Sequence, residues 1–269
     1  MSERRLRAVL LDWAGTTVDY GSRAPVAVLR AVFAEWGVTV DDAAIRRHMG
    51  LRKFDHLTAL CALPGVQRAW FAALGRELER ADIEALYARF EAIQPTLLLE
   101  HSHVLPWTPA AVAQLRSQGL RIGSTTGYTR PMLAPLLEQA EREGYKPDAS
   151  VTPDEAPAGR PFPWMAYLNA LRLQVYPLEA WVKIGDTPSD MEEGRNAGMW
   201  CVGILVGGNG AGMTEAEWNS MPLLGQVRRK EQVAAQLLVA GAHTVVETLA
   251  DAPAALALLE ERYRAGEKP

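Results

Sequence analysis

The hydrophobic residues of this chain follow two different patterns in consecutive stretches. An apolar run, Ala8–Leu11, ends in a polar segment at Asp12, which is typical of a buried strand. Apolar residues then recur at helical spacing, which predicts helices at 25–36, 41–49, 53–62, 66–76 and 81–98. No strand is predicted among them, so we expect a helical block directly after the first strand.

Beyond Val104–Pro109, predicted strands and helices alternate. We expect strands at 120–124, 149–151, 181–184, 200–206 and 243–246, helices at 130–143, 163–173 and 189–197, and further helices at the C-terminal end. Such alternation predicts an α/β fold with a Rossmann-like, mostly parallel sheet and helices on both faces. The expected domains are an α/β core of residues 1–20 and 100–269 and an inserted all-helical domain of residues 21–99.

Composition and charge narrow the classes of function. With 269 residues and 48% hydrophobic content, the chain can bury a large core in one large domain or two unequal ones. The net charge of -4 and the scattered basic residues do not suggest binding to nucleic acid or to a membrane surface. No apolar run reaches the ~18 residues of a membrane span, and residues 1–7 do not resemble a signal sequence, so we expect a cytoplasmic protein. Cys61 and Cys201 are expected to be reduced structural thiols.

The first candidate for chemistry is Asp12, at the end of the first predicted strand. Open α/β sheets bind their ligands at the carboxyl ends of their strands. Gly15 allows a sharp turn, and Thr16 and Thr17 supply hydroxyl and backbone N–H groups that suit a phosphoryl group. Asp12 is therefore a candidate nucleophile.

Three later segments place polar residues after predicted strands. The hydroxyl of Thr126 and the N–H of Gly127 suit a phosphoryl oxygen, although an ordinary capped turn has the same pattern. Arg160 precedes a helix and offers a bidentate cation, or is a surface loop residue. Asp186 is a candidate ligand of Mg²⁺, which uses one or two carboxylates together with substrate phosphate. Asp190 is expected to support that site or to cap the following helix.

In this order the motifs resemble the haloacid dehalogenase superfamily, beginning with the segment Asp12-Trp-Ala-Gly-Thr-Thr-Val-Asp-Tyr20. The resemblance implies that the helical block is a cap that closes over the site, and that Asp12 forms an aspartyl-phosphate. It also implies Mg²⁺ as cofactor, held by Asp12, Asp186 and the Ala14 carbonyl. Phosphatases of the superfamily usually have a general-acid aspartate at the position of Ala14. Alanine there, with Arg160 instead of the usual lysine, resembles the phosphonoacetaldehyde hydrolases, the phosphonatase branch.

Within the predicted helical block, Lys53 by itself would be a solvated helix lysine. The segment Met49-Gly-Leu-Arg-Lys-Phe-Asp-His56 resembles the part of the cap in which phosphonatases carry the lysine that forms a Schiff base with their aldehyde substrate. The resemblance makes Lys53 that lysine and places Met49, His56 and Tyr128 around it. Ser22 stands where some relatives have cysteine, and we expect no essential role for it. A reactive lysine must be neutral, so we expect burial and neighbouring cations to depress the pKa of Lys53.

The function implied by the resemblance is hydrolysis of the C–P bond of phosphonoacetaldehyde to acetaldehyde and phosphate, in the degradation of 2-aminoethylphosphonate. The substrate would be a small-molecule phosphonate, without nucleic acid or membrane as partner. A Mg²⁺-dependent phosphate monoesterase of the same superfamily is the alternative, but it would need another general acid. A binding or regulatory module with an inactive site is the third possibility, and the presence of the full set of motifs argues against it.

Two further segments have patterns that can indicate a binding site, and the family resemblance also concerns the assembly of the protein. The glycine-rich segment Val206–Gly212 follows a strand but does not have the spacing of a dinucleotide-binding loop. His101 and His103 lie in a linker without an evident carboxylate partner, so we expect a solvated loop and not a metal site. The family resemblance suggests a homodimer, possible through the apolar residues of Val26–Trp36, although the same pattern suits a contact between cap and core.

Overall fold

The central element of the protein is a parallel sheet of six strands. The computed structural model describes residues 5–269, apart from the side chain of Thr96. The strand order is β3-β2-β1-β4-β5-β6, and each neighbouring pair is parallel. The strands are β1 (Ala8–Leu11), β2 (Arg121–Thr125), β3 (Ala149–Val151), β4 (Trp181–Gly185), β5 (Trp200–Ile204) and β6 (Thr244–Val246). The predicted α/β fold is therefore confirmed, and β1 lies in the middle of the sheet.

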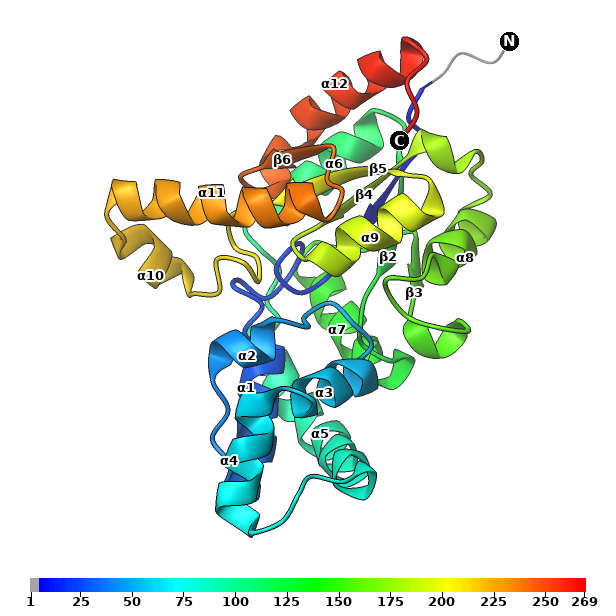
Figure 1. Ribbon diagram of the computed structural model, residues 1–269. Coiled ribbons are helices and arrows are strands. Elements are labelled where there is room, and N and C mark those ends of the chain that lie inside the picture. The colour runs from blue at the N-terminus through cyan, green and yellow to red at the C-terminus, as the bar shows by residue number, and fades with distance from the viewer. Residues whose placement is uncertain (1–4) are drawn as a thin grey trace.

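Helices cover both faces of this sheet (Figure 1). One face contacts α8, α9 and α11, and the other contacts α6 and α12. The helices of this part are α6 (Thr108–Ser117), α7 (Arg130–Arg142), α8 (Trp164–Leu173), α9 (Pro188–Ala197), α10 (Glu215–Ser220), α11 (Leu223–Val239) and α12 (Ala252–Arg264), with short 3₁₀ turns at Pro153–Glu155, Leu178–Ala180 and Leu249–Asp251.

The sequence pattern did not predict α6, α10 or α11. The case of α11 is instructive, because it buries only Val233 and Leu237 along its length. Several of its other apolar residues, among them Leu223, Leu224 and Val239, are exposed, so the contact of α11 with the sheet depends on few side chains.

The helical block predicted between β1 and β2 forms a separate layer below the sheet in Figure 1. Its helices, which we call the cap, are α1 (Ala24–Glu35), α2 (Asp42–Arg46), α3 (Lys53–Cys61), α4 (Pro64–Leu74) and α5 (Arg80–His101). A proline occupies the first turn of α1, where a missing N–H costs nothing. The capping box of Glu79 and Asp82 begins α5. The apolar face of α1 packs against α5, so most apolar residues of Val26–Trp36 are buried within one chain.

Other expectations from the sequence have mixed outcomes. Cys61 and Cys201 are buried and free, as expected of reduced thiols. His103 is exposed, but its Nδ1 lies 2.9 Å from Oε1 of Glu143, so the expectation that this segment lacks a carboxylate partner is wrong. Within residues 5–269 no single helix is long and apolar enough to cross a membrane. Only α3 and α4 taken together, bent by 75°, satisfy that criterion of length and composition.

Candidate active site

A small cavity of about 20 Å³ lies between the carboxyl end of β1 and the cap. It is lined by residues of the cap and by residues near the ends of the strands, namely Asp12, Ala14, Ser22, Pro25, Met49, Gly50, Lys53, Thr126, Gly127, Tyr128, Arg160 and Thr187. The structure therefore brings together most of the residues that the sequence singled out. Of those residues, His56, Asp186 and Asp190 are buried nearby but do not line the cavity.

Asp12 is positioned by the parallel ladder at the end of β1. Its backbone N–H donates to the Ile184 carbonyl at 3.0 Å, and its own carbonyl accepts from the Thr17 hydroxyl at 2.9 Å. The side chain is only 5% exposed, and Oδ1 lies 2.7 Å from Nη2 of Arg160. Burial and the Asp190 carboxylate raise the pKa of Asp12, while the cations of Arg160 and Lys183 oppose that rise. A nearby cation is therefore needed to keep this carboxylate ionised.

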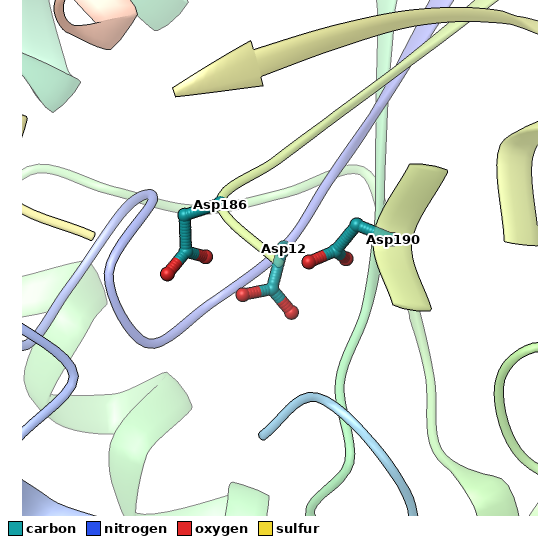
Figure 2. A group of neighbouring side chains, drawn as sticks. All are labelled: Asp12, Asp186 and Asp190. Carbon is teal, nitrogen blue, oxygen red and sulfur yellow. The ribbon is translucent and has the colours of Figure 1, made fainter. Parts of the chain in front are cut away.

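Asp186 and Asp190 converge on Asp12 from the end of β4 and the start of α9 (Figure 2). One carboxylate oxygen from each of the three residues lies within 4.8 Å of the others. Oδ1 of Asp186 accepts from the Thr16 hydroxyl at 2.9 Å, and Oδ2 accepts from the Asn209 N–H at 2.6 Å. Burial, followed by the charges of Asp12 and Asp190, raises the pKa of Asp186 well above its usual range. Asp186 therefore lies in predominantly negative surroundings.

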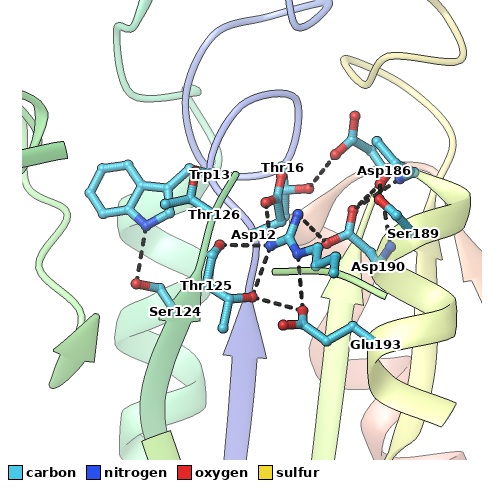
Figure 3. Close-up of polar contacts among 12 residues, drawn as sticks. Asp12, Trp13, Thr16, Ser124, Thr125, Thr126, Asp186, Ser189, Asp190 and Glu193 are labelled. Atoms are coloured by element: carbon cyan, nitrogen blue, oxygen red, sulfur yellow. Dashed lines mark hydrogen bonds and ion pairs between the residues drawn. The ribbon is translucent and has the colours of Figure 1, made fainter. Parts of the chain in front are cut away.

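Asp190 already has partners for both of its oxygens. It occupies the third position of the capping box of α9, where the Thr187 hydroxyl donates to Oδ2 at 2.5 Å. Oδ1 lies 2.9 Å from Nη1 of Arg160 and 2.9 Å from Nζ of Lys183. Figure 3 shows Asp190 and Glu193 projecting from α9 toward Asp12 and Thr125. Burial raises the pKa of Asp190, but the two cations outweigh that effect and the net shift is downward. These contacts favour a supporting and capping role over direct binding of a metal.

The structure adds three residues to the site that the sequence reasoning missed, namely Lys183, Glu193 and Thr125. Lys183 is fully buried in β4, with Nζ 2.9 Å from Asp190 and 2.9 Å from Glu193. Lys183 and Arg160 also donate to the Thr125 hydroxyl, which donates to Glu193. The available signals were a lysine inside an apolar strand and a glutamate three residues after Asp190 on one helix face. A strand lysine can equally face solvent, so the signal alone did not identify it.

The charges of this cluster do not balance. Ion pairs join three buried carboxylates, those of Asp12, Asp190 and Glu193, to the two cations of Arg160 and Lys183. A fourth carboxylate, that of Asp186, lies beside those of Asp12 and Asp190. Burying uncompensated charge costs several kcal/mol per ion. A divalent cation would supply the missing positive charge, and carboxylate oxygens are the donors that Mg²⁺ prefers. The residues present therefore fit a hard divalent cation.

Lys53 enters the cavity from the first turn of α3. It is 5% exposed, and its Nζ lies 4.9 Å from the centre of the Tyr128 ring. Burial lowers the pKa of Lys53 to about 8, with Asp12 opposing the shift and Arg160 reinforcing it. The expected depression of this pKa is therefore confirmed, and burial is its main cause. The Tyr128 hydroxyl is buried and has no hydrogen-bond partner within the part of the chain described.

His56 lies one turn after Lys53 on α3 and is also buried. Its Nε2 is 2.7 Å from the Ile45 carbonyl. Because a carbonyl only accepts, the proton of the neutral ring sits on Nε2 and Nδ1 keeps its lone pair. No other described residue bonds to Nδ1. Burial, with the charge of Lys53, lowers the pKa of His56 to about 3, so the imidazole is neutral and Nδ1 is available as a hydrogen-bond acceptor.

Comparison with known proteins gives consistent results. Residues 6–198 match the model of the haloacid dehalogenase-like hydrolase family. The chain is 45% identical over 258 residues to a phosphonoacetaldehyde hydrolase of Bacillus cytotoxicus, covering 96% of this chain and 98% of the relative. It is 43% identical over 264 residues to the phosphonoacetaldehyde hydrolase of Syntrophobacter fumaroxidans, covering 98% and 95%. A phosphonoacetaldehyde hydrolase-like protein from Oleispira antarctica superposes with a TM-score of 0.96 and 34% identity, over 99% and 97% of the two chains.

Proposed function

The chain belongs to the phosphonoacetaldehyde hydrolases of the haloacid dehalogenase-like family, and from this premise we propose that it hydrolyses phosphonoacetaldehyde to acetaldehyde and phosphate. One observation carries the proposal. The buried amine of Lys53 and the carboxylate of Asp12 line the same cavity. The amine of Lys53 can thus react with the aldehyde of a small substrate while the carboxylate of Asp12 attacks its phosphorus from the other domain.

The phosphonate group is bound on the core side of the cavity. Arg160, the Thr126 hydroxyl and the Gly127 N–H hold its oxygens through charge-assisted hydrogen bonds. Asp12, Asp186 and the Ala14 carbonyl would hold Mg²⁺. When bound, this ion offsets the repulsion between the nucleophile and the phosphonate dianion.

The reaction begins at Lys53. Its neutral amine attacks the aldehyde carbon, and loss of water leaves a protonated imine on Nζ. A water molecule that donates a hydrogen bond to Nδ1 of His56 carries protons to and from the amine. Met49 and Tyr128 enclose the amine and keep it out of bulk water. Enclosure lowers the pKa and raises the neutral fraction of the lysine.

Cleavage of the C–P bond follows from the imine. A carboxylate oxygen of Asp12 attacks phosphorus, and the electron pair of the C–P bond moves into the imine to form an enamine. Protonation of the enamine at carbon and hydrolysis of the imine release acetaldehyde and restore Lys53. Water then hydrolyses the aspartyl-phosphate. Since no alkoxide leaves, an acid at the position of Ala14 would have nothing to protonate.

The decisive experiment is borohydride reduction in the presence of phosphonoacetaldehyde, followed by peptide mass mapping. We expect a reduced adduct on Lys53, and we expect Lys53→Arg to lose acetaldehyde release while keeping the fold. Absence of the adduct, or normal turnover by the variant, would refute the imine mechanism. Release of phosphate from simple phosphate esters without an adduct would instead favour the monoesterase alternative.

Several broader assignments belong to the same proposal. The cap extends over residues 21–99, and the core over 1–20 and 100–269. The active form is a homodimer, testable by solution mass measurement. Because the apolar face of α1 is largely buried within one chain, the contact must use other cap residues as well. The enzyme acts in the cytoplasm in 2-aminoethylphosphonate degradation, which cell fractionation and growth on that compound would test.

A further inference from the structure

The glycine-rich loop after β5 has no part in the reaction described above, yet it reaches the candidate metal site. Its Asn209 donates a backbone N–H to Oδ2 of Asp186 at 2.6 Å. The preceding Gly208 lies so close that a Cβ there would be 2.5 Å from the Cβ of Asp186. A side chain at position 208 would displace that carboxylate. The loop therefore holds Asp186 in place.

The side chain of the same Asn209 contacts the cap. Nη1 of Arg46, the last residue of α2, donates to Oδ1 of Asn209 at 3.1 Å. In return, Nδ2 of Asn209 donates to the Arg46 carbonyl at 3.1 Å. We call this reciprocal pair the latch. It joins the cap to the loop whose backbone holds Asp186.

Arg46 also holds the linker through which the chain passes from core to cap. Its Nη1 lies 2.7 Å from the Gly21 carbonyl and 3.3 Å from the Ser22 carbonyl. In this linker Asp19 and Ser22 have φ values of 57° and 49°, a region that residues other than glycine seldom adopt. Such a conformation persists where surrounding contacts hold it. One guanidinium thus contacts both the linker and the metal-site loop.

The cap is seated on the core at the other side of the cavity as well. A Cβ on Gly50 would be 2.2 Å from the Ser189 hydroxyl oxygen, and one on Gly127 would be 2.3 Å from the Leu51 carbonyl oxygen. Glycine at both positions permits this close approach of the two domains. The latch contacts are therefore those of a closed arrangement and would be lost if the cap moved away.

We propose that Arg46 and Asn209 are positioning residues that couple closure of the cap to metal affinity at Asp186. The inference rests on the proposed function, which places the metal at that carboxylate. With the cap closed, the latch orders the loop, and the hydrogen bond from the Asn209 N–H holds Oδ2 of Asp186 in a fixed position. With the cap open, Asn209 loses both side-chain partners and the loop has fewer contacts. Because coupling between two equilibria is reciprocal, metal binding must favour closure to the same extent.

Calorimetric titration of the full-length protein with Mg²⁺, in the absence of substrate, tests this coupling. Arg46→Met and Asn209→Ala should each weaken Mg²⁺ binding by roughly threefold to tenfold, the effect of about one net hydrogen bond. The double variant should bind about as weakly as Asn209→Ala, because Asn209→Ala removes both latch hydrogen bonds and Arg46→Met removes only one of the same two. Arg47→Met and Asn219→Ala, matched changes at exposed positions outside the latch, should bind Mg²⁺ like the parent protein.

The outcomes separate this inference from the proposed function. If the parent protein binds Mg²⁺ and Arg46→Met binds it equally well, the coupling is refuted while the reaction stands. If the parent protein does not bind Mg²⁺, the coupling fails, whereas the reaction is decided by the adduct on Lys53. Hydrogen exchange supplies a second measurement, because Mg²⁺ should slow exchange of the linker amides 19–23 in the parent protein but not in folded Arg46→Met. Equal slowing in both proteins would also refute the coupling.

Discussion

The reactivity of Lys53 should depend on pH in a way that follows from its burial. Only the neutral amine attacks an aldehyde, and an ordinary lysine with a pKa of about 10.4 is neutral in roughly one molecule of 2,500 at pH 7. Burial lowers the pKa of Lys53 to about 8, so about a tenth of the molecules carry the neutral amine at that pH. The cavity therefore increases the reactive fraction by about 200-fold.

Competitive labelling with acetic anhydride at a series of pH values, followed by mass spectrometry of the peptides, measures this pKa directly. The labelling of Lys53 should rise with a midpoint near pH 8, and the exposed Lys268 supplies the internal reference. For the unliganded enzyme, kcat/KM should rise about tenfold per pH unit below that midpoint and level off above it. A labelling midpoint near 10, or a pH-independent kcat/KM below pH 8, would refute the argument from burial.

The same labelling experiment can test the direction in which each charged neighbour shifts the pKa of Lys53. The carboxylate of Asp12 raises the pKa of Lys53 and the guanidinium of Arg160 lowers it. Asp12→Asn should therefore move the midpoint below 8, and Arg160→Met should move it above 8. Both variants are expected to be inactive, which does not affect labelling. A shift in the reverse direction for either would mean that the charge does not act on Lys53 across the cavity.

Three further predictions concern the core side of the site. Ala14→Asp should reduce acetaldehyde release, since a second carboxylate near the nucleophile adds like charge and finds no leaving group to protonate; faster release would contradict this reasoning. Exhaustive chelation or Asp186→Ala should abolish turnover with the fold retained by circular dichroism, and full activity in the chelated enzyme would exclude the proposed metal. Lys183→Met should lower the free energy of unfolding by about 3–5 kcal/mol, because it leaves Asp190 and Glu193 buried with one cation fewer. Urea unfolding measures this loss, and unchanged stability would mean that the pairs contribute nothing.

The sequence by itself determined where the chemistry begins. A short apolar strand followed at once by polar residues places Asp12 and Asp186 at one sheet edge, because parallel strands share the direction of their carboxyl ends. Alanine in place of an acidic residue at position 14, together with the segment around Lys53, indicated the phosphonatase branch from the sequence alone. The helix α1, whose buried residues recur at helical spacing, was equally evident from its period.

The tertiary structure alone decided which charges are buried and what they touch. Lys53 and Lys183 look like solvated residues in their own segments, and only packing from distant parts of the chain removes water from them. The loop around Asn209 resembled an imperfect nucleotide motif, and its contacts with Arg46 join residues 163 positions apart. The residue pattern of one segment indicates which face of that helix or strand is apolar. Desolvation and pairing of a charge depend on segments that come together only in the fold, so they cannot be derived from the pattern of one segment.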